Sequence, residues 1–524
     1  MEENLTELPD IGAELKLKAK ENKNYIRRVV YNPNETLEHK IDRLVLDLKN
    51  TKEEVQEMIN FLGMSLTASQ FSAAKLHILP KKERYIISSA QNASEVNLKL
   101  LHNIEAYASF IGAEIGIIAT RYKNPTSMFK EGDDVWDERT HPYLTANRQF
   151  LHKNLLLLAD LKVQATSPNP TNGLELFGDH ASVIVGSPRI EMRSVSVLPG
   201  QLQKFLYSTG TVTIPNFTDS VAGGKAVEHH TYGFVVVEIE NEEVVHVRNV
   251  SADVDGNFND LIYRVEDTAV TAEDVECFVW GDSHFARKDE NVTNGFRKLC
   301  KDLGIETSVL HDVWDSKSIN VHNLKNPIVQ HELMKSGEDD LKKELEQMYN
   351  ELNWFSDNMT KTIVVASNHD DMLDRALVQT QWTDNLKNAE IFIELLGLKL
   401  SLKAPNGLIP YYINEKFHNI QALGINDSYI LHGVELGLHG HKGPNGSRGS
   451  VKSFARLSQK TIIGHSHSPS IHWGCYQVGL SCSMEHGYNQ GLSSWAYAGC
   501  TLNKHGKRQM IILNQNTLTY TTLY

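Results

Sequence analysis

Five short motifs rich in Asp, Asn and His are spread along the second half of this 524-residue chain. They are Asp282-Ser283-His284, His311-Asp312, Asn368-His369-Asp370, His439-Gly440-His441 and His465-Ser466-His467. In an extended backbone the side chains at i and i+2 point to the same side, so Asp282 and His284 can reach one point together. Oxygen and nitrogen ligands without thiolates suit Mn, Fe or Zn better than Mg or Ca. The motifs therefore predict a metal site.

Apolar runs that predict buried strands stand just before these motifs, at residues 277–280, 308–310, 362–365, 429–431 and 461–463. Helices are predicted between them, at 292–303, 329–355 and 389–398. Because the ends of neighbouring strands lie at one edge of a sheet, residues far apart in sequence can share one crevice there. This alternation predicts an α/β catalytic domain over residues 271–524.

The ordered set Asp-x-His, Asp, Asn-His-Asp, His-Gly and Gly-His-x-His resembles the calcineurin-like metallophosphoesterase family over roughly residues 275–475. The resemblance implies a β-sandwich flanked by helices, with residues 510–513 closing its second sheet. It also implies two divalent cations, which about 3.5–4 Å apart can activate water and neutralise a phosphodiester. Asp282, His284 and His467 would hold the first ion, Asn368, His439 and His465 the second, and Asp312 would bridge them. Mn is expected from the family's nucleases, with Fe and Zn as alternatives.

Four assignments stay open at this point. His311 stands where the family commonly has Gly, which leaves Asp315 as an alternative bridge. His441 and His432 compete with His439. By resemblance, His369 faces the phosphate as general acid or transition-state stabiliser. Asp370 would either orient His369 or cap the next helix.

The glycine-rich loop 437–449 offers cations for substrate contact. Small residues let the backbone approach a phosphate closely, and Lys442 and Arg448 could grip flanking phosphates, as could Arg287 after the first motif. Stabilisation of the loop is an equally weighted alternative.

This loop, the stretch from His229 to Phe234 and the arrangement of the whole chain look like the first-step-transfer proteins of T5-type bacteriophages. The resemblance implies a role early in infection that includes destruction of host DNA and control of phage DNA entry. It therefore implies DNA as the substrate, a second phage transfer protein as a candidate partner, and the host cytoplasm as the location.

Composition narrows the class of protein. The formal net charge of −13 argues against a broad, nonspecific nucleic-acid coat, although not against a local basic groove. Five scattered cysteines in no zinc spacing indicate reduced thiols in a cytosolic compartment. No apolar run reaches the length of a membrane span.

Residues 1–80 predict a helical module, with helices at 36–49, 51–62 and 67–78 and a capping box at Thr51–Glu54. The turn at 63–66 has helix-turn-helix spacing, but a plain packing module is favoured. The basic run from Lys16 to Arg28 is expected to be solvated surface. Residues 81–270 predict a mixed α/β accessory domain that selects substrate, assembles protomers or binds a partner. Its His229-His230 pair and Gly223-Gly224-Lys225 are expected to be structural.

The leading hypothesis is a divalent-metal DNA nuclease. A metallophosphatase or phosphodiesterase acting on a phosphoprotein or nucleotide is the second. The third is a non-enzymatic DNA-transfer or takeover protein with a structural metal site, against which an intact His369 argues.

Overall fold

The computed structural model describes residues 12–22, 26, 37–61, 79–121, 135–323, 326–487 and 489–521. They form a mixed α/β structure with four sheets. No helix among these residues is long and apolar enough to cross a membrane. The 3-10 helices are η1 (Glu138–Tyr143), η2 (Phe285–Arg287), η3 (Lys317–Ile319), η4 (Trp382–Asp384), η5 (Leu386–Asn388) and η6 (Pro444–Gly446).

The N-terminal helices are α1 (Ala13–Glu21), α3 (Leu37–Leu48) and α4 (Lys52–Phe61), which pack on one another through a small apolar core. Two of the three predicted helices are thus confirmed. So is the capping box, since Thr51 N donates to Glu54 Oε2 at 2.9 Å and Glu54 N donates to Thr51 Oγ1 at 3.2 Å. The predicted helix at 67–78, the turn at 63–66 and Lys23, Arg27 and Arg28 of the basic run lie outside the described residues.

The next unit is a five-stranded sheet in the order β10-β9-β1-β2-β3. The predicted strand-helix-strand unit is confirmed, with β1 and β2 parallel and α6 between them in sequence. The bounds are β1 (Arg84–Gln91), α6 (Leu98–Ile111), β2 (Glu114–Thr120), β3 (Leu144–Thr145), β9 (Gly233–Ile239) and β10 (Val245–Ser251). A three-stranded sheet of β11 (Phe258–Asp260), β12 (Tyr263–Glu266) and β13 (Ala269–Ala272) follows β10.

A ten-stranded sheet runs through both halves of the chain, in the order β18-β19-β20-β22-β21-β7-β8-β6-β5-β4. Its first half contains β4 (Arg148–His152), β5 (Leu155–Leu158), β6 (Ser182–Val185), β7 (Glu191–Val195) and β8 (Lys204–Ser208). Its second half contains β18 (Ile430–Leu431), β19 (Val434–Glu435), β20 (Lys460–Ile463), β21 (Ser470–His472) and β22 (Cys475–Gln477). Because β7 pairs with β21, the sheet crosses the domain boundary predicted near residue 270.

The six-stranded sheet has the order β17-β16-β15-β14-β23-β24. Its strands are β14 (Cys277–Asp282), β15 (Thr307–His311), β16 (Lys361–Val365), β17 (Ile420–Ala422), β23 (Ala498–Leu502) and β24 (Arg508–Ile512). Strands β14 to β17 run parallel, as expected for strands joined by helical crossovers. Strand β24 extends this sheet beside β23, so the expectation that residues 510–513 close the second sheet is wrong.

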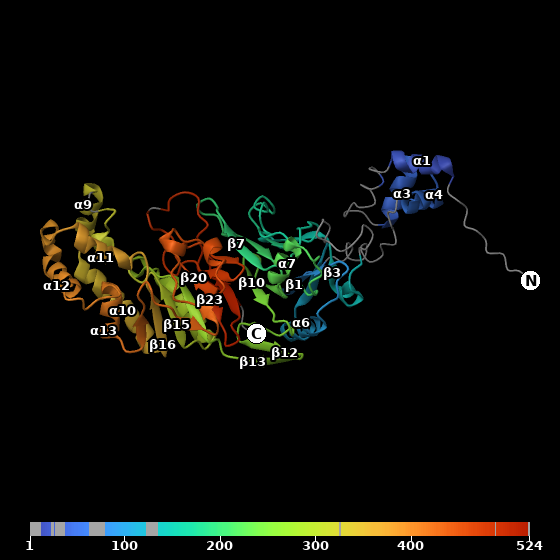
Figure 1. Ribbon diagram of the computed structural model, residues 1–524. Coiled ribbons are helices and arrows are strands. Elements are labelled where there is room, and N and C mark those ends of the chain that lie inside the picture. Colours follow the sequence, from blue (N-terminus) through green and yellow to red (C-terminus); the bar gives the residue numbers. More distant parts are fainter. Residues whose placement is uncertain are drawn as a thin grey trace, which may run out of the picture.

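Helices cover one face of this sheet, as Figure 1 shows for α10 to α13 beside β15 and β16. These helices are α8 (Glu290–Asp302), α10 (Leu341–Asn358), α11 (Asp370–Gln379), α12 (Ala389–Leu400) and α13 (Leu408–Lys416). Helix α9 (Pro327–Ser336) precedes α10 in the chain. Elsewhere in the chain lie α7 (Val221–Glu228) and α14 (Val451–Phe454). The single helix predicted at 329–355 is two helices, because Gly337 ends α9 in a left-handed conformation and the side chain of Asp340 caps α10.

The other face of the six-stranded sheet packs against the ten-stranded sheet. Phe278 and Trp280 of β14 belong to the core under the helices, whereas Cys277 and Val279 belong to the core between the sheets. This alternation is the period of two expected for a strand with both faces buried. Apolar residues of β20 and β22 complete the core between the sheets. The two layers therefore bring the ends of β14, β15, β16 and β20 to one region.

Candidate metal centre

The predicted site residues lie at or shortly after the C-terminal ends of five strands, β14, β15, β16, β19 and β20. Asp282 is the last residue of β14, His311 is the last residue of β15, and the strand register places them opposite each other. His465 and His467 follow β20 of the other sheet. The His465 backbone N–H donates to Asp282 Oδ2 at 2.8 Å, which ties the two sheets together at this point.

A first group of donors consists of Asp282, His284, Asp312 and His467, all buried. His467 Nε2 lies 3.0 Å from Asp282 Oδ2 and 3.2 Å from His284 Nε2. His284 Nε2 lies 3.6 Å from Asp312 Oδ2. One donor atom from each residue falls within 4.8 Å of the others, so this group could hold a metal ion.

A second group surrounds His439. Its Nε2 lies 3.2 Å from Asn368 Oδ1 and 3.3 Å from Asp312 Oδ2, and its ring centroid is 5.2 Å from that of His465. The same Asp312 oxygen is thus within 3.6 Å of His284 and 3.3 Å of His439, one imidazole from each group. The structure therefore brings together all seven residues predicted as ligands, with Asp312 between the two groups.

The electrostatics of this cluster fit a divalent cation. Asp282 Oδ1 and Asp312 Oδ1 are buried and have no hydrogen-bond partner among the described residues, a state that costs about 1–3 kcal/mol per group. Although burial opposes ionisation, His439, His369 and His284 hold the pKa of Asp312 well below its usual value. Burial likewise opposes protonation of His284, yet Asp315 and Asp312 raise the pKa of that imidazole to about 9. Two buried carboxylates held ionised among nitrogen donors are a suitable environment for a cation.

The side chains converge through strained backbone and not through extended strand. His284, Asp312, His465 and His467 have φ values of 36°, 47°, 77° and 60°, in the left-handed region that side chains other than Gly rarely adopt. The expectation that Asp282 and His284 meet because alternate strand residues share a side is therefore wrong in its reason, although the two do meet. Such strain concentrates at functional sites.

The structure separates the two candidate bridging carboxylates. Asp315 Oδ1 lies 3.0 Å from His284 Nδ1 and 3.3 Å from Arg287 Nε, on the side of the imidazole away from His467. Asp315 therefore orients His284 and does not lie between the two groups. A carboxylate behind a histidine ligand is a common means of fixing its tautomer.

The two alternatives to His439, which are His432 and His441, lie at different distances from the site. His432 lies in the turn between β18 and β19 and is 3.6 Å from Glu276, which precedes β14, whereas Asp282 ends that strand. His432 is therefore at the opposite end of the sandwich. His441 stays close, with its ring centroid 5.4 Å from that of His439 and both ring nitrogens buried without a partner among the described residues. Burial and His439 lower the pKa of His441 to about 3, so it offers a neutral imidazole.

His369 is half-buried at the start of α11, with Nδ1 3.0 Å from the Asp315 carbonyl oxygen and its ring centroid 5.0 Å from that of His284. Asp370 Oδ2 accepts from the Ser367 backbone N–H at 2.9 Å. This bond closes the turn before α11, whose first residue is Asp370, and no side-chain cap hydrogen bond is found there among the described residues, so neither predicted role of Asp370 is shown. The Asp315 carbonyl is what orients His369.

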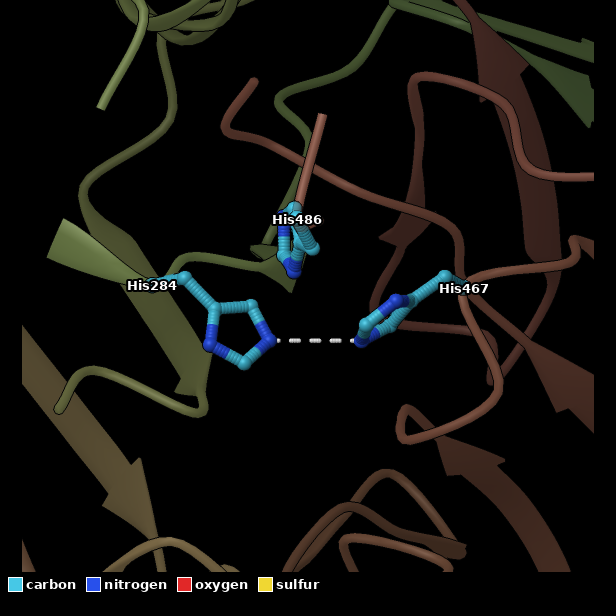
Figure 2. Close-up of side chains that lie close together, drawn as sticks. All are labelled: His284, His467 and His486. Carbon is cyan, nitrogen blue, oxygen red and sulfur yellow. Dashed lines mark hydrogen bonds between the residues drawn. The ribbon is translucent and has the colours of Figure 1, made fainter. Parts of the chain in front are cut away.

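Two histidines at the site were not predicted. His486 follows β22 in a loop, and Figure 2 shows its ring beside those of His284 and His467, with which it could hold a metal ion. The dipeptide His486-Gly487 repeats the His-Gly pattern of the fourth motif and was the available signal. His311, noted only as a replacement for Gly, is buried with Nδ1 3.4 Å from His439 Nδ1.

The three cations predicted to contact substrate differ in how they are engaged. Arg287 donates hydrogen bonds from Nε to Asp315 Oδ1 at 3.3 Å and from Nη1 to the His486 carbonyl oxygen at 3.2 Å. It therefore holds residues of the site in position. Lys442 is exposed and pairs with Asp371 at 2.8 Å. Arg448 is exposed and forms a backbone bridge with Lys442 in the glycine-rich loop. Their contact with substrate stays a prediction.

Gly464, between β20 and His465, is expected to tolerate no side chain. A Cβ there would lie 2.2 Å from Asp282 Oδ1 and 3.0 Å from His311 Cγ. Gly464→Ala should therefore displace Asp282, destabilise the fold by about 1–3 kcal/mol and reduce bound metal measured by elemental analysis. Gly397→Ala is the control, because nothing lies within 4 Å of a Cβ at that position of α12. Unchanged metal content in Gly464→Ala would show that the Asp282 carboxylate is not held as described.

Comparisons with known proteins found similarity to one phage protein. It is 29% identical over 460 residues to Protein A1 of Escherichia phage T5, and the match covers 82% of this chain and 81% of that protein. The chain is therefore homologous to a T5 phage protein over most of its length. No protein-family model matches the chain. No solved structure matches it.

Proposed function

We propose that this chain is a divalent-metal-dependent phosphodiesterase of the calcineurin-like type that cleaves DNA, and that it acts early in phage infection in degrading host DNA and supporting DNA transfer. One observation carries the proposal: a buried carboxylate, Asp312, lies between two groups of oxygen and nitrogen donors, and a further imidazole, His369, lies at their edge. Homology to a T5 phage protein supports the biological setting.

In this proposal Asp282, His284 and His467 would hold a first cation, Asn368, His439 and His465 would hold a second, and Asp312 would serve both. The donor set favours Mn, Fe or Zn, and Mn is our first choice. Bound divalent cations neutralise phosphate charge and lower the pKa of water. His486 and His441 enlarge the nitrogen-rich surroundings of the two groups.

Residues of the chain itself would carry out the proton transfer and position the ligands. If His369 Nδ1 donates its proton to the Asp315 carbonyl, Nε2 is the nitrogen free to exchange a proton with substrate. In the imidazolium form, which carries a proton on each nitrogen, Nε2 would give its proton to the departing oxygen of the scissile phosphodiester and leave His369 as a neutral imidazole. Arg287 and Asp315 would keep His284 in place while this happens.

The test is a panel of substrates with the full-length protein and Mn²⁺: plasmid DNA, single-stranded DNA, p-nitrophenyl phosphate esters and a phosphopeptide. We expect cleavage of DNA that EDTA stops and added Mn²⁺ restores. Hydrolysis of the phosphopeptide or a nucleotide ester without DNA cleavage would instead indicate a phosphatase of the same chemistry. Bound metal with no hydrolysis of any substrate would leave a structural metal site in a DNA-transfer protein.

A further inference from the structure

A second polar cavity lies at the opposite end of β20 from the candidate metal centre. Its volume is about 350 Å³, within the range of small-molecule sites. Lys460, at the start of β20, lines it, whereas His465 follows the end of that strand. The cavity is also lined by Arg189, His229, Trp473, Lys507 and Arg508. The cavity is therefore separate from the site described above.

The lining of this cavity contains more positively charged side chains than negatively charged ones. Its lining contains four cations (Arg189, Lys460, Lys507 and Arg508) and one carboxylate, the exposed Glu228. Two carboxylates lie nearby: Glu191, which acts on Arg189 and is 3.2 Å from His472, and Asp253, which is 3.7 Å from Arg264. Burial, with smaller contributions from nearby cations such as Lys460 and against the opposing effect of Asp253, lowers the pKa of Lys507 to about 8. The fold thus holds cations close together at a cost that a bound anion would offset.

Buried donors in the lining lack acceptors. Arg189 is only 4% exposed, and its Nε and Nη1 have no hydrogen-bond partner among the described residues. Trp473 Nε1 is likewise buried and has no hydrogen-bond partner among the described residues. Buried guanidinium N–H groups without an acceptor are rare in folded proteins, because they lose hydration without compensation. These donors indicate a ligand rich in acceptor oxygens.

Aromatic stacking fixes the position of Trp473. Its ring stacks with those of His229 and His472, with centroid distances of 4.2 and 4.8 Å. His230 has a different role, because its Nε2 lies 2.9 Å from the Thr213 carbonyl oxygen. Both histidines line the cavity, and the contact with Thr213 gives His230 the structural role expected of the pair.

We propose that this cavity binds a phosphate group, carried by inorganic phosphate or by a nucleoside 5′-monophosphate, with Arg189 and Lys507 as its principal contacts. Guanidinium and ammonium groups are the usual protein partners of phosphate. The cavity is small enough to exclude duplex DNA, so the ligand is a small phosphorylated molecule. The site does not depend on the proposed nuclease activity.

The test is isothermal titration calorimetry of the full-length protein in EDTA, with inorganic phosphate, dAMP and deoxyadenosine as separate ligands. We expect saturable one-to-one binding of phosphate or dAMP and none of deoxyadenosine. Tighter binding of dAMP than of phosphate would identify a nucleotide as the source of the group, and equal binding would identify free phosphate. Absence of saturable binding for both would overturn the proposal.

Variants locate the binding. Lys507→Gln should weaken it by at least about tenfold, as should Arg189→Gln if that buried variant folds. Lys452→Gln, an exposed lysine of α14, is the matched control and should bind as the unmodified protein does. Asp312→Asn should also leave it unchanged, because that residue lies at the other end of β20. Binding lost in Asp312→Asn but kept in Lys507→Gln would place the phosphate at the metal centre and refute the proposal.

Discussion

Replacing Asp312 with asparagine is expected to leave a folded protein that retains at most one of two bound cations and cleaves DNA at least about 10²-fold more slowly. The substitution keeps the shape of the side chain but removes the charge that lies 3.6 Å from His284 Nε2 and 3.3 Å from His439 Nε2. Because the same oxygen faces both groups, losing its charge weakens both at once. Elemental analysis after dialysis against Mn²⁺ measures the metal, and a plasmid-nicking assay measures the activity.

Asp315→Asn is the informative comparison. That carboxylate lies behind His284 and not between the groups, so its loss should weaken only the first cation, by about 10–100-fold, and should spare the second. Asp219→Asn, at an exposed position before α7, controls for the general effect of removing a charge. A full complement of two ions in Asp312→Asn together with loss of both in Asp315→Asn would exchange the roles assigned to the two residues.

The sequence was sufficient to predict which residues lie close together in the site, but not which role each of them has. The ligand motifs could be recognised because each follows an apolar run, and parallel strands deliver their ends to one edge. The choice between Asp312 and Asp315 needed coordinates, because both follow β15 within four residues and only the left-handed turn at Asp312 directs that carboxylate between His284 and His439. Local backbone strain of this kind leaves no periodic signal in a sequence.

Contacts between segments far apart in the chain were the second feature that the sequence did not predict. His486 comes from a loop with no hydrophobic period, so its His-Gly dipeptide was the one signal in the sequence, and tertiary packing is what places it beside His284 and His467. The pairing of β7 with β21 joins residues almost 280 positions apart, as in Ile471 opposite Met192. Such non-local pairing is specified by packing between sheets and not by local propensity. The break between α9 and α10, by contrast, was visible as Gly337 and was overlooked.

His369→Ala is expected to abolish most DNA cleavage while leaving the metal content unchanged. A positioned general acid contributes about 10²–10⁴-fold, and the loss should appear in kcat more than in KM if the imidazole acts on the leaving oxygen. The ring is held by the Asp315 carbonyl at 3.0 Å and is half-buried at the start of α11, so its removal should leave the ligand residues in place. His331→Ala, at an exposed position of α9, is the matched control.

Metal content is the decisive second measurement for this variant, because His369 also forms a group with His284 and Asp315 whose donor atoms lie within 4.8 Å of one another. If His369→Ala loses both activity and a bound ion, the imidazole is a ligand and the proton-transfer role fails. If the variant keeps its metal and cleaves DNA normally, His369 takes no part in the reaction. Loss of cleavage with both ions retained is the result that a proton donor beside an intact metal centre requires.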